Sequence, residues 1–337
     1  MQGIAMSRNL FLGRWLHRSA LAIAGAGTLA LAPFAQAAWP ERPIQMVVPF
    51  PAGSSPDVLA RAIAEPLAKD LGQAVVVENK PGAGGNIGTR HASKAKPDGY
   101  TILLTINGPM VTAPSLYKKT LGYDPLKDLA PITLVGTSPN VLVVPQDFPA
   151  KNVQEFVSLA KARPGELNYG TVGPGSSSHL GMAMLEHQAD IRLQQIPYTG
   201  FPQIITSIIA GDVQAGFMVP GIAMTQVKAG KARALAITSL EPSDVLPGIP
   251  TMASQGYPGF ESISWDAIFV PAGTPGDIVA KLNSAIGKIL ARDDVRQKMA
   301  ALYFTPAPST PEALTTLVVN EKKRWEEVID RLGLSLD

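Results

Sequence analysis

Short apolar segments alternate with helical patterns along this chain, and this alternation limits the possible folds more than any other feature of the sequence. Near the start, the apolar run Ile44–Val48 precedes the helical pattern Val58–Lys69, which is followed by the apolar run Ala74–Glu78. A strand, a helix and a second strand in this order are typical of a parallel sheet with crossover helices. We therefore predict an α/β protein.

A second series of the same kind lies between residues 167 and 238. After it, amphipathic helical patterns begin at Thr274 and Thr310, each followed directly by proline. Two series and a resumed C-terminal part indicate two lobes, with the middle of the chain inserted into the first. We expect lobe 1 to contain residues 38–138 and 263–337, and lobe 2 residues 139–262. A ligand cleft would then lie between the lobes, at the C-terminal ends of parallel strands.

Residues 1–37 have the features of a secretory signal peptide. Three arginines precede an apolar run from Ala20 to Ala32, and Ala35 and Ala37 form a small-residue cleavage pattern. The run is shorter than the about 20 residues that a membrane-spanning helix needs. We predict cleavage near Ala37 and export of a soluble protein.

Composition excludes several classes of partner. Without the three arginines of the leader, the 29 Lys and Arg fall to 26 against 27 Asp and Glu, a net charge of −1. A near-neutral chain with 6% aromatic residues and no basic block is not expected to bind nucleic acid or a membrane surface. The chain has no cysteine, so disulfides and thiol chemistry are excluded.

The stretch Val47–Asp57 joins the first strand to the first helix. Ser55 is expected as the N-cap, Pro56 as the first helical residue and Asp57 as a first-turn acid. Free N–H groups and the helix dipole at such a helix start suit a carboxylate or phosphate. A capped turn without any ligand is the alternative.

A second loop of this kind, from Gly173 to His179, also follows a strand and leads into a helix. Its Ser176, Ser177 and His179 offer hydroxyl and imidazole groups beside another helix start. Two such loops facing one cleft could hold two carboxylates, or a carboxylate and a neutral group. The alternative is two independent capped turns.

Three further stretches lie at predicted strand ends, where a cleft would be. Amide, phenol and hydroxyl groups there could orient a ligand, while Phe and Met would give it apolar walls. No Arg or Lys lies in these stretches, so an anion would be held by neutral donors and helix dipoles. The residues concerned are Asn107, Met110, Tyr198, Thr199, Phe217 and Met218.

The sequence offers little support for catalysis, a metal or a cofactor. Neither Ser54 nor Ser177 has the glycines of a nucleophile elbow, and the histidines show no metal-binding spacing. The glycines from Gly82 to Gly88 lack the spacing of a dinucleotide loop. We expect no catalytic residue, no metal and no cofactor, although His179 with a serine leaves an exported hydrolase or isomerase as an alternative.

Taken together in order, several segments resemble the substrate-binding proteins of tripartite tricarboxylate transporters, the Bug family. The resemblance covers nearly all of the chain after the leader, through WPERPIQMVVPFPAGSSPD, LGQAVVVENKPGAGGNIGT, KPDGYTILL, GYDPLKDLAPITLVG, LNYGTVGPGSSSHL, IPYTG, KAGKARALAIT and SWDAIFVPAGTP. It implies a two-lobed, type II-like Venus-flytrap fold in the periplasm. It also implies a monomer that closes on a small carboxylate and delivers it to membrane permease subunits. A chemosensory binder that docks a membrane receptor is a further alternative.

The resemblance also implies which loops hold the ligand. The first-lobe loop corresponds to Phe50, Ala52, Gly53, Ser54, Ser55 and Asp57, and the other lobe contributes Ser176, Ser177, His179, Tyr198 and Thr199.

This chain departs from the family pattern at three positions, one of which is Ala113, where relatives often have Asn. Met110 stands where relatives often have His, and Met218 where they commonly have Asp, so an acidic partner for a ligand ammonium is missing there. We therefore expect an aromatic or medium-length aliphatic mono- or dicarboxylate.

Overall fold

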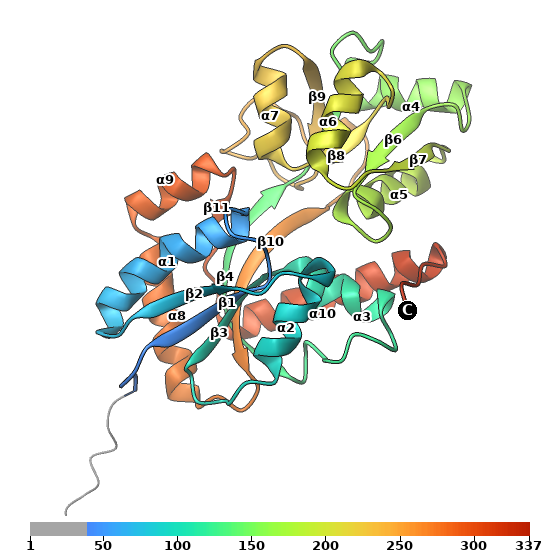
Figure 1. Ribbon diagram of the computed structural model, residues 1–337. Helices are drawn as coiled ribbons and strands as arrows, with labels where there is room; N and C mark the ends of the chain where they lie inside the picture. Colours follow the sequence, from blue (N-terminus) through green and yellow to red (C-terminus); the bar gives the residue numbers. More distant parts are fainter. Residues whose placement is uncertain (1–38) are drawn as a thin grey trace, which may run out of the picture. The chain divides into compact units, whose positions relative to one another are not determined.

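The computed structural model describes residues 39–337, so the predicted signal peptide lies outside the described residues. The larger sheet has six strands (Figure 1). In spatial order they are β11 (Thr305–Pro306), β4 (Leu129–Pro139), β10 (Ile263–Pro271), β3 (Thr101–Ile106), β1 (Ile44–Val48) and β2 (Val75–Asn79).

The pairing in this sheet is mixed. β1 is parallel to β2 and β3, as the alternation of strands and helices predicts. β10 is antiparallel to both β3 and β4, and β11 is antiparallel to β4. The antiparallel pairing follows from the path of the chain. The chain leaves this sheet through β4 and returns to it through β10, so β4 and β10 run in opposite directions.

Helices cover both faces of the sheet. On one face, α1 (Ser55–Leu71), α8 (Gly276–Leu290) and α9 (Asp293–Ala301) contact one another. On the other, α2 (Asn86–Ser93) and α10 (Pro311–Arg331) share a core with a π-helical turn at Gly108–Thr112, which continues into the short α3 (Ala113–Leu116). The early stop considered at Pro66 does not occur, because α1 continues to Leu71.

The middle of the chain forms two smaller sheets. β5 (Val141–Pro145) lies between β8 (Gly216–Met218) and β9 (Ala232–Ile237) and is antiparallel to both, so parallel pairing was a wrong prediction for these strands. β6 (Asn168–Thr171) and β7 (Gln194–Pro197) are parallel. Four helices complete this part: α4 (Val153–Ala162), α5 (Ser177–Ala189), α6 (Phe201–Ala210) and α7 (Pro220–Lys228).

The chain passes between the two sheet systems at two adjacent points. Only Asn140 separates β4 from β5, and Ser262 directly precedes β10. The Asn140 side chain donates to the Ser262 carbonyl at 3.1 Å, and the Thr238 hydroxyl donates to the same carbonyl at 2.7 Å. These bonds tie the two crossing points together. The expected lobe boundaries fall at this place, and the division into lobes stays a prediction.

Gly88 in α2 marks a close approach of helix and sheet that holds the first loop in place. A Cβ at this position would lie 2.6 Å from the Lys80 carbonyl oxygen and 2.7 Å from Pro49 Cβ. We expect Gly88→Ala to lower the free energy of unfolding by about 1–3 kcal/mol, because backbone atoms must move. The control Gly287→Ala, in α8 with nothing within 4 Å, should be neutral or stabilising by up to about 1 kcal/mol. Urea denaturation measures both, and equal stabilities of the two variants would contradict this packing.

Candidate functional site

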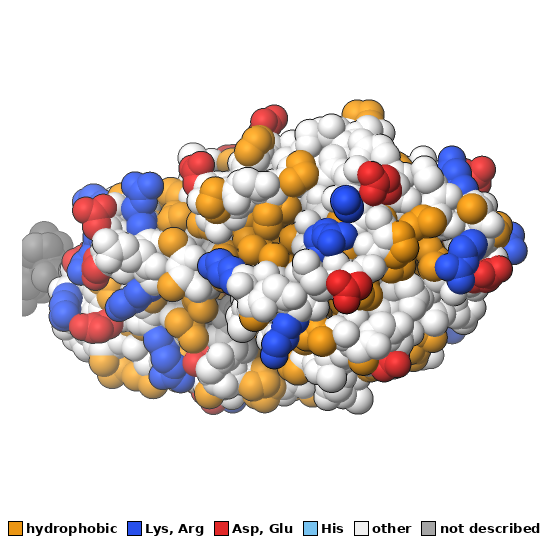
Figure 2. Space-filling view, turned by 90° about the horizontal axis from the view of Figure 1, so that it is seen from above, with side chains coloured by type: hydrophobic (Ala, Val, Ile, Leu, Met, Phe, Trp, Pro, Cys, Tyr) orange, Lys and Arg blue, Asp and Glu red, His pale blue; other side chains and the backbone are white. Residues whose placement is uncertain are grey.

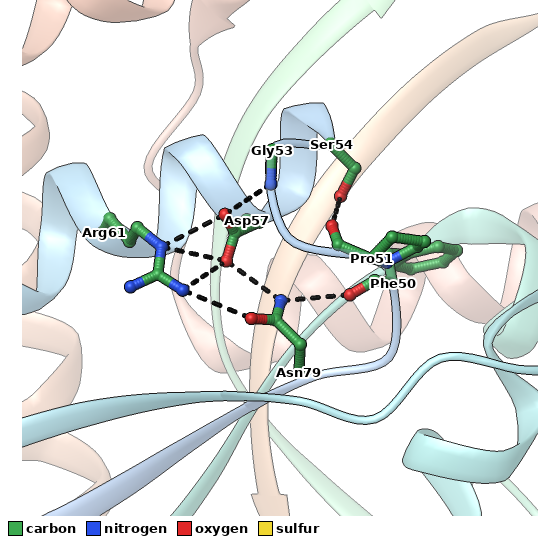
Figure 3. A network of polar contacts seen from close by, with 7 residues as sticks. All are labelled: Phe50, Pro51, Gly53, Ser54, Asp57, Arg61 and Asn79. Carbon is green, nitrogen blue, oxygen red and sulfur yellow. Dashed lines mark hydrogen bonds and ion pairs between the residues drawn. The ribbon is translucent and has the colours of Figure 1, made fainter.

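The loop between β1 and α1 is shaped by the carboxylate of Asp57 (Figure 3). Asp57 Oδ2 accepts the Gly53 N–H at 2.8 Å, and Arg61 Nε donates to both carboxylate oxygens at 3.1 Å. Asn79 Nδ2 donates to Asp57 Oδ1 at 2.9 Å and to the Phe50 carbonyl at 3.0 Å. Figure 3 shows Asp57 enclosed by these partners. The carboxylate therefore fixes the loop from within.

The burial and hydrogen bonds of Asp57 explain its ionisation. Only 2% of the residue is exposed. Burial alone would raise the pKa of Asp57, but the hydrogen bonds from Arg61, Gly53 and Asn79 outweigh it and lower the pKa below its usual value. The expectation that Asp57 also touches the ligand stays a prediction. Its oxygens are occupied, and it acts as a positioning residue.

The cap of α1 differs from the expected one by one residue. The helix begins at Ser55, so Ser54 is the N-cap. The Ser54 hydroxyl donates to the Pro51 carbonyl at 2.7 Å, and no side chain caps the first turn. Since the first-turn N–H groups of a helix have no acceptor within the helix, this end of α1 keeps donors for a ligand.

The loop before α5 repeats the geometry of the first loop. Ser176 is the N-cap, with the same φ of −70° and ψ of 160° as Ser54, and its hydroxyl donates to the Gly173 carbonyl at 2.7 Å. The Gly175 N–H donates to His179 Nδ1 at 3.1 Å, as the Gly53 N–H does to Asp57. Each loop is thus closed by a side chain four residues after a glycine. One difference is that Ser176 Oγ also accepts the His179 N–H, at 3.3 Å, and so caps its helix.

His179 is a closing group of the second loop, held in a defined protonation state. The residue is 7% exposed, and burial lowers the pKa of its imidazole below the usual 6.5. Because Nδ1 accepts a hydrogen bond, the neutral ring carries its proton on Nε2. Through this contact His179 shapes the loop.

We expect the contribution of His179 to the stability of the folded chain to fall as the pH drops below 6.5. The unfolded chain gains a proton at His179 before the folded chain does, so stability rises with pH between the folded and unfolded pKa values. His179→Asn keeps an acceptor for the Gly175 N–H but does not titrate, and should flatten this slope. Chemical denaturation between pH 5 and 7.5 measures it, and an unchanged slope in the variant would contradict the assignment.

A cavity of about 470 Å³ brings both sheet systems together. Its lining residues come from the first loop, the turns after β3, the Gly/Ser loop before α5, the crossing strand and α10. They are Phe50, Ala83, Gly84, Asn86, Ile106, Asn107, Gly108, Thr112, Ala113, Leu116, Tyr117, Val172, Pro174, Gly175, Ser176, Ser177, Leu180, Phe201, Val219, Ser262, Ser264, Trp325 and Leu336. None of these described lining residues has a charged side chain. The cavity thus offers hydroxyl, amide and backbone donors between apolar walls.

The predicted site residues divide into three groups. Four of them line the cavity: Phe50, Asn107, Ser176 and Ser177. Others lie in the neighbouring loops and first helical turns without being part of the lining: Ala52, Gly53, Ser54, Ser55, Asp57, His179, Tyr198 and Thr199. The third group is completely buried in hydrophobic cores: Met110, Phe217 and Met218.

The side chains of the third group are packed inside hydrophobic cores, and their contact with a ligand stays a prediction. Met110 packs with Trp265 and α10, and Phe217 stacks on Phe260 with ring centroids 5.8 Å apart. Residues at a strand end alternate between faces, and these side chains point into the cores. The apolar wall of the cavity is formed by residues such as Trp325. From the helical pattern of α10 alone, Trp325 is predicted to be a core residue. No signal in the sequence separates Trp325 from the other apolar positions of α10.

Among residues 39–337, no cluster of three or more acidic or histidine side chains could hold a metal ion, and no helix is long and apolar enough to cross a membrane. Acidic and basic side chains are interspersed on the face that Figure 2 shows.

Comparison with known proteins decides the family. Residues 59–334 match the family described as "Tripartite tricarboxylate transporter family receptor". The chain belongs to this family. It is 36% identical to protein BugT of Bordetella pertussis, over 90% of this chain and 94% of BugT. The solved structure of the periplasmic binding protein BugD is 38% identical and superposes with a TM-score of 0.72, covering 88% of this chain and 99% of BugD.

A second solved relative, an R. palustris protein with adipate, is 33% identical with a TM-score of 0.77, covering 89% of this chain and all of that one. These similarities confirm the predicted resemblance and the two-lobed α/β fold of periplasmic binding proteins.

Proposed function

We propose that this receptor-family protein is an exported solute-binding protein that captures a small carboxylate between its lobes. A ligand that touches both lobes stabilises the closed state by its higher affinity for that state, and the permease subunits of a tripartite transporter recognise it. The proposed ligand is an aromatic or medium-length aliphatic mono- or dicarboxylate. The protein acts as a monomer in the periplasm and performs no chemistry on its ligand.

The observation that carries the proposal is the uncharged cavity between the two sheet systems. Phe50 and Asn107 reach it from one side, and Ser176 and Ser177 from the other. Where no cationic side chain lines a cavity, an anion is held by backbone N–H groups, hydroxyls and helix N-termini. The uncapped start of α1, near Phe50, supplies such donors.

Two further features support the chemical class of the ligand. The apolar lining, which includes Leu116, Phe201 and Trp325, suits a carbon skeleton longer than that of the smallest acids. The R. palustris relative was solved with adipate, a six-carbon dicarboxylate. On closure we expect Ala52 to Ser55, Tyr198 and Thr199 to complete the site.

A thermal-shift screen of residues 38–337 against carboxylates tests the proposal. A ligand at about 100 times its Kd stabilises the folded state by about 2.7 kcal/mol, which is a clear shift in Tm. Adipate, phthalate and benzoate should raise Tm, whereas the matched diols and benzyl alcohol should not. A flat response to every carboxylate would overturn the proposal, and turnover of a bound ester that His179→Ala abolishes would favour the hydrolase alternative.

A further inference from the structure

The end of α10 turns the chain in a fixed direction. Gly333 has a φ of 62°, in the left-handed region, and its N–H donates to the Asp330 carbonyl at 3.1 Å. The Leu334 N–H donates to the Ile329 carbonyl at 3.1 Å, and Leu334 packs against the core that contains Ile329. These two bonds and the apolar contact form a Schellman motif. The motif directs residues 334–337, which we call the strap, away from the axis of α10.

The strap is fastened to α3 and to the turn that follows it. The Leu336 N–H donates to the Leu116 carbonyl at 2.7 Å. Asp337 Oδ1 accepts the Lys119 N–H at 2.9 Å, the Thr120 N–H at 3.2 Å and the Thr120 hydroxyl at 3.1 Å. Figure 1 shows α10 and α3 side by side. Hydrogen bonds on both sides of the Leu336 side chain therefore hold it in one place.

This position puts Leu336 in the lining of the candidate cavity. It lies there with three other large side chains, Leu116, Tyr117 and Trp325. Leu116 is 4% exposed and Trp325 is 3% exposed, so the core holds both of them. Leu336 is 36% exposed and keeps surface that a ligand can cover. It is therefore the part of this wall whose position depends on the strap.

We propose that Leu336 is a specificity-determining residue, which limits the length of the carboxylate that the cavity accepts. The inference rests on the proposed function, because it assumes that the cavity binds a carboxylate. It adds a substrate class: dicarboxylates about as long as adipate are bound in preference to longer homologues such as sebacate.

Close packing explains why a fixed leucine at this place discriminates by length. A longer skeleton must bend or push the side chain aside, and overpacking of this kind is unfavourable. The hydrogen bonds of Asp337 oppose such a displacement. Truncation of Leu336 should therefore have opposite effects on two ligands: a short acid loses an apolar contact, and a long acid gains space. A general loosening of the fold would weaken the binding of both.

Calorimetric titration with glutarate, adipate, suberate and sebacate tests the proposal. We expect the wild type to bind adipate more tightly than sebacate. Leu336→Ala should shift the ratio of the two Kd values in favour of sebacate by at least about tenfold, since single methylenes change affinity in an apolar pocket by about this factor. Asp337→Ala keeps the leucine but loosens the strap, and should shift the ratio in the same direction by a smaller factor.

Leu332→Ala is the matched control. Leu332 is 40% exposed, much like Leu336, but does not line the cavity, so the ratio should stay at the wild-type value. A ratio that Leu336→Ala leaves unchanged, or that Leu332→Ala shifts equally, would overturn the inference. A wild type that binds sebacate as tightly as adipate, or binds aromatic acids alone, would also overturn it and leave the proposed function standing. Failure of every carboxylate to bind would overturn the proposed function and the inference together.

Discussion

Asp57→Ala should lower the free energy of unfolding by about 3 kcal/mol and weaken carboxylate binding at least about tenfold. The substitution leaves the Gly53 N–H and the Asn79 amide without their acceptor, and Arg61 without its counter-charge. The loop before α1 would then lose the geometry that holds its donors together. Urea denaturation measures the first effect, and calorimetry with the best ligand of the carboxylate screen measures the second.

The control for Asp57 lies on the same helix. Glu65 pairs with Lys69 at 2.9 Å, but both side chains are mostly exposed, so Glu65→Ala should change neither stability nor affinity measurably. The effect of Asp57 also depends on pH. Because its pKa is lower in the folded chain, its contribution is complete above the unfolded value and is lost as the pH falls through the folded value. A wild type and an Asp57→Ala variant of equal stability at pH 7 would contradict the loop assignment.

Asp266→Asn should make the protein more stable at alkaline pH. Burial raises the pKa of Asp266 to about 8, from 3.8 in the unfolded chain. Between these values Asp266 holds its proton in the folded chain and loses it in the unfolded chain, so the contribution of Asp266 to stability falls as the pH rises. One pKa unit corresponds to about 1.4 kcal/mol, and the accumulated loss by pH 8 is on the order of 4 kcal/mol after relaxation of the site. Asparagine does not titrate and avoids this loss.

Denaturation of both proteins at pH 4.5, 6 and 8 measures the difference. We expect nearly equal stabilities at the lowest pH, because asparagine resembles the protonated acid in shape and polarity. The advantage of the variant should grow with each step in pH. A difference that is constant over the three values would show that Asp266 does not keep its proton on folding.

Local sequence patterns reveal some features of the two loops and leave others hidden. The runs PAGSSPD and GPGSSSH were recognisable as strand-to-helix loops, because glycine, serine and proline have strong positional preferences at helix starts. The sequence did not show that the residue in the seventh position of each run turns back to the glycine N–H. This contact is a tertiary arrangement, so the role of Asp57 and His179 in shaping the loops was not predicted.

The cavity walls were harder to predict for a different reason. Met110 and Met218 were placed beside the ligand because they lie at or after strand ends, but Met110 is part of the π-helical turn and β8 is buried on both faces, with Phe217 in one core and Met218 in another. Trp325 reaches the cavity from a helix more than 200 residues away from Asn107 in the sequence, and no local pattern indicates this. Asp266 did carry a signal, an acid within the apolar run from Ser264 to Val270, which is unusual for a strand buried on both faces.

The antiparallel pairing in the middle of the chain also lay beyond the reach of local patterns. The alternation of strands and helices predicts parallel pairs, and β6 with β7 follows this rule. β5 follows β4 after a single residue, so its direction is fixed by the crossing between the sheet systems and not by a crossover helix. The crossing from the larger sheet thus imposes the reversal on β5, the first strand after it.

Small-angle X-ray scattering of residues 38–337, with and without a saturating carboxylate from the thermal-shift screen, tests the central claim most directly. If the ligand is captured between two lobes that close on it, the radius of gyration should fall on saturation and stay constant with the matched alcohol. A carboxylate that saturates the protein by calorimetry and leaves the radius of gyration unchanged would contradict capture by closure.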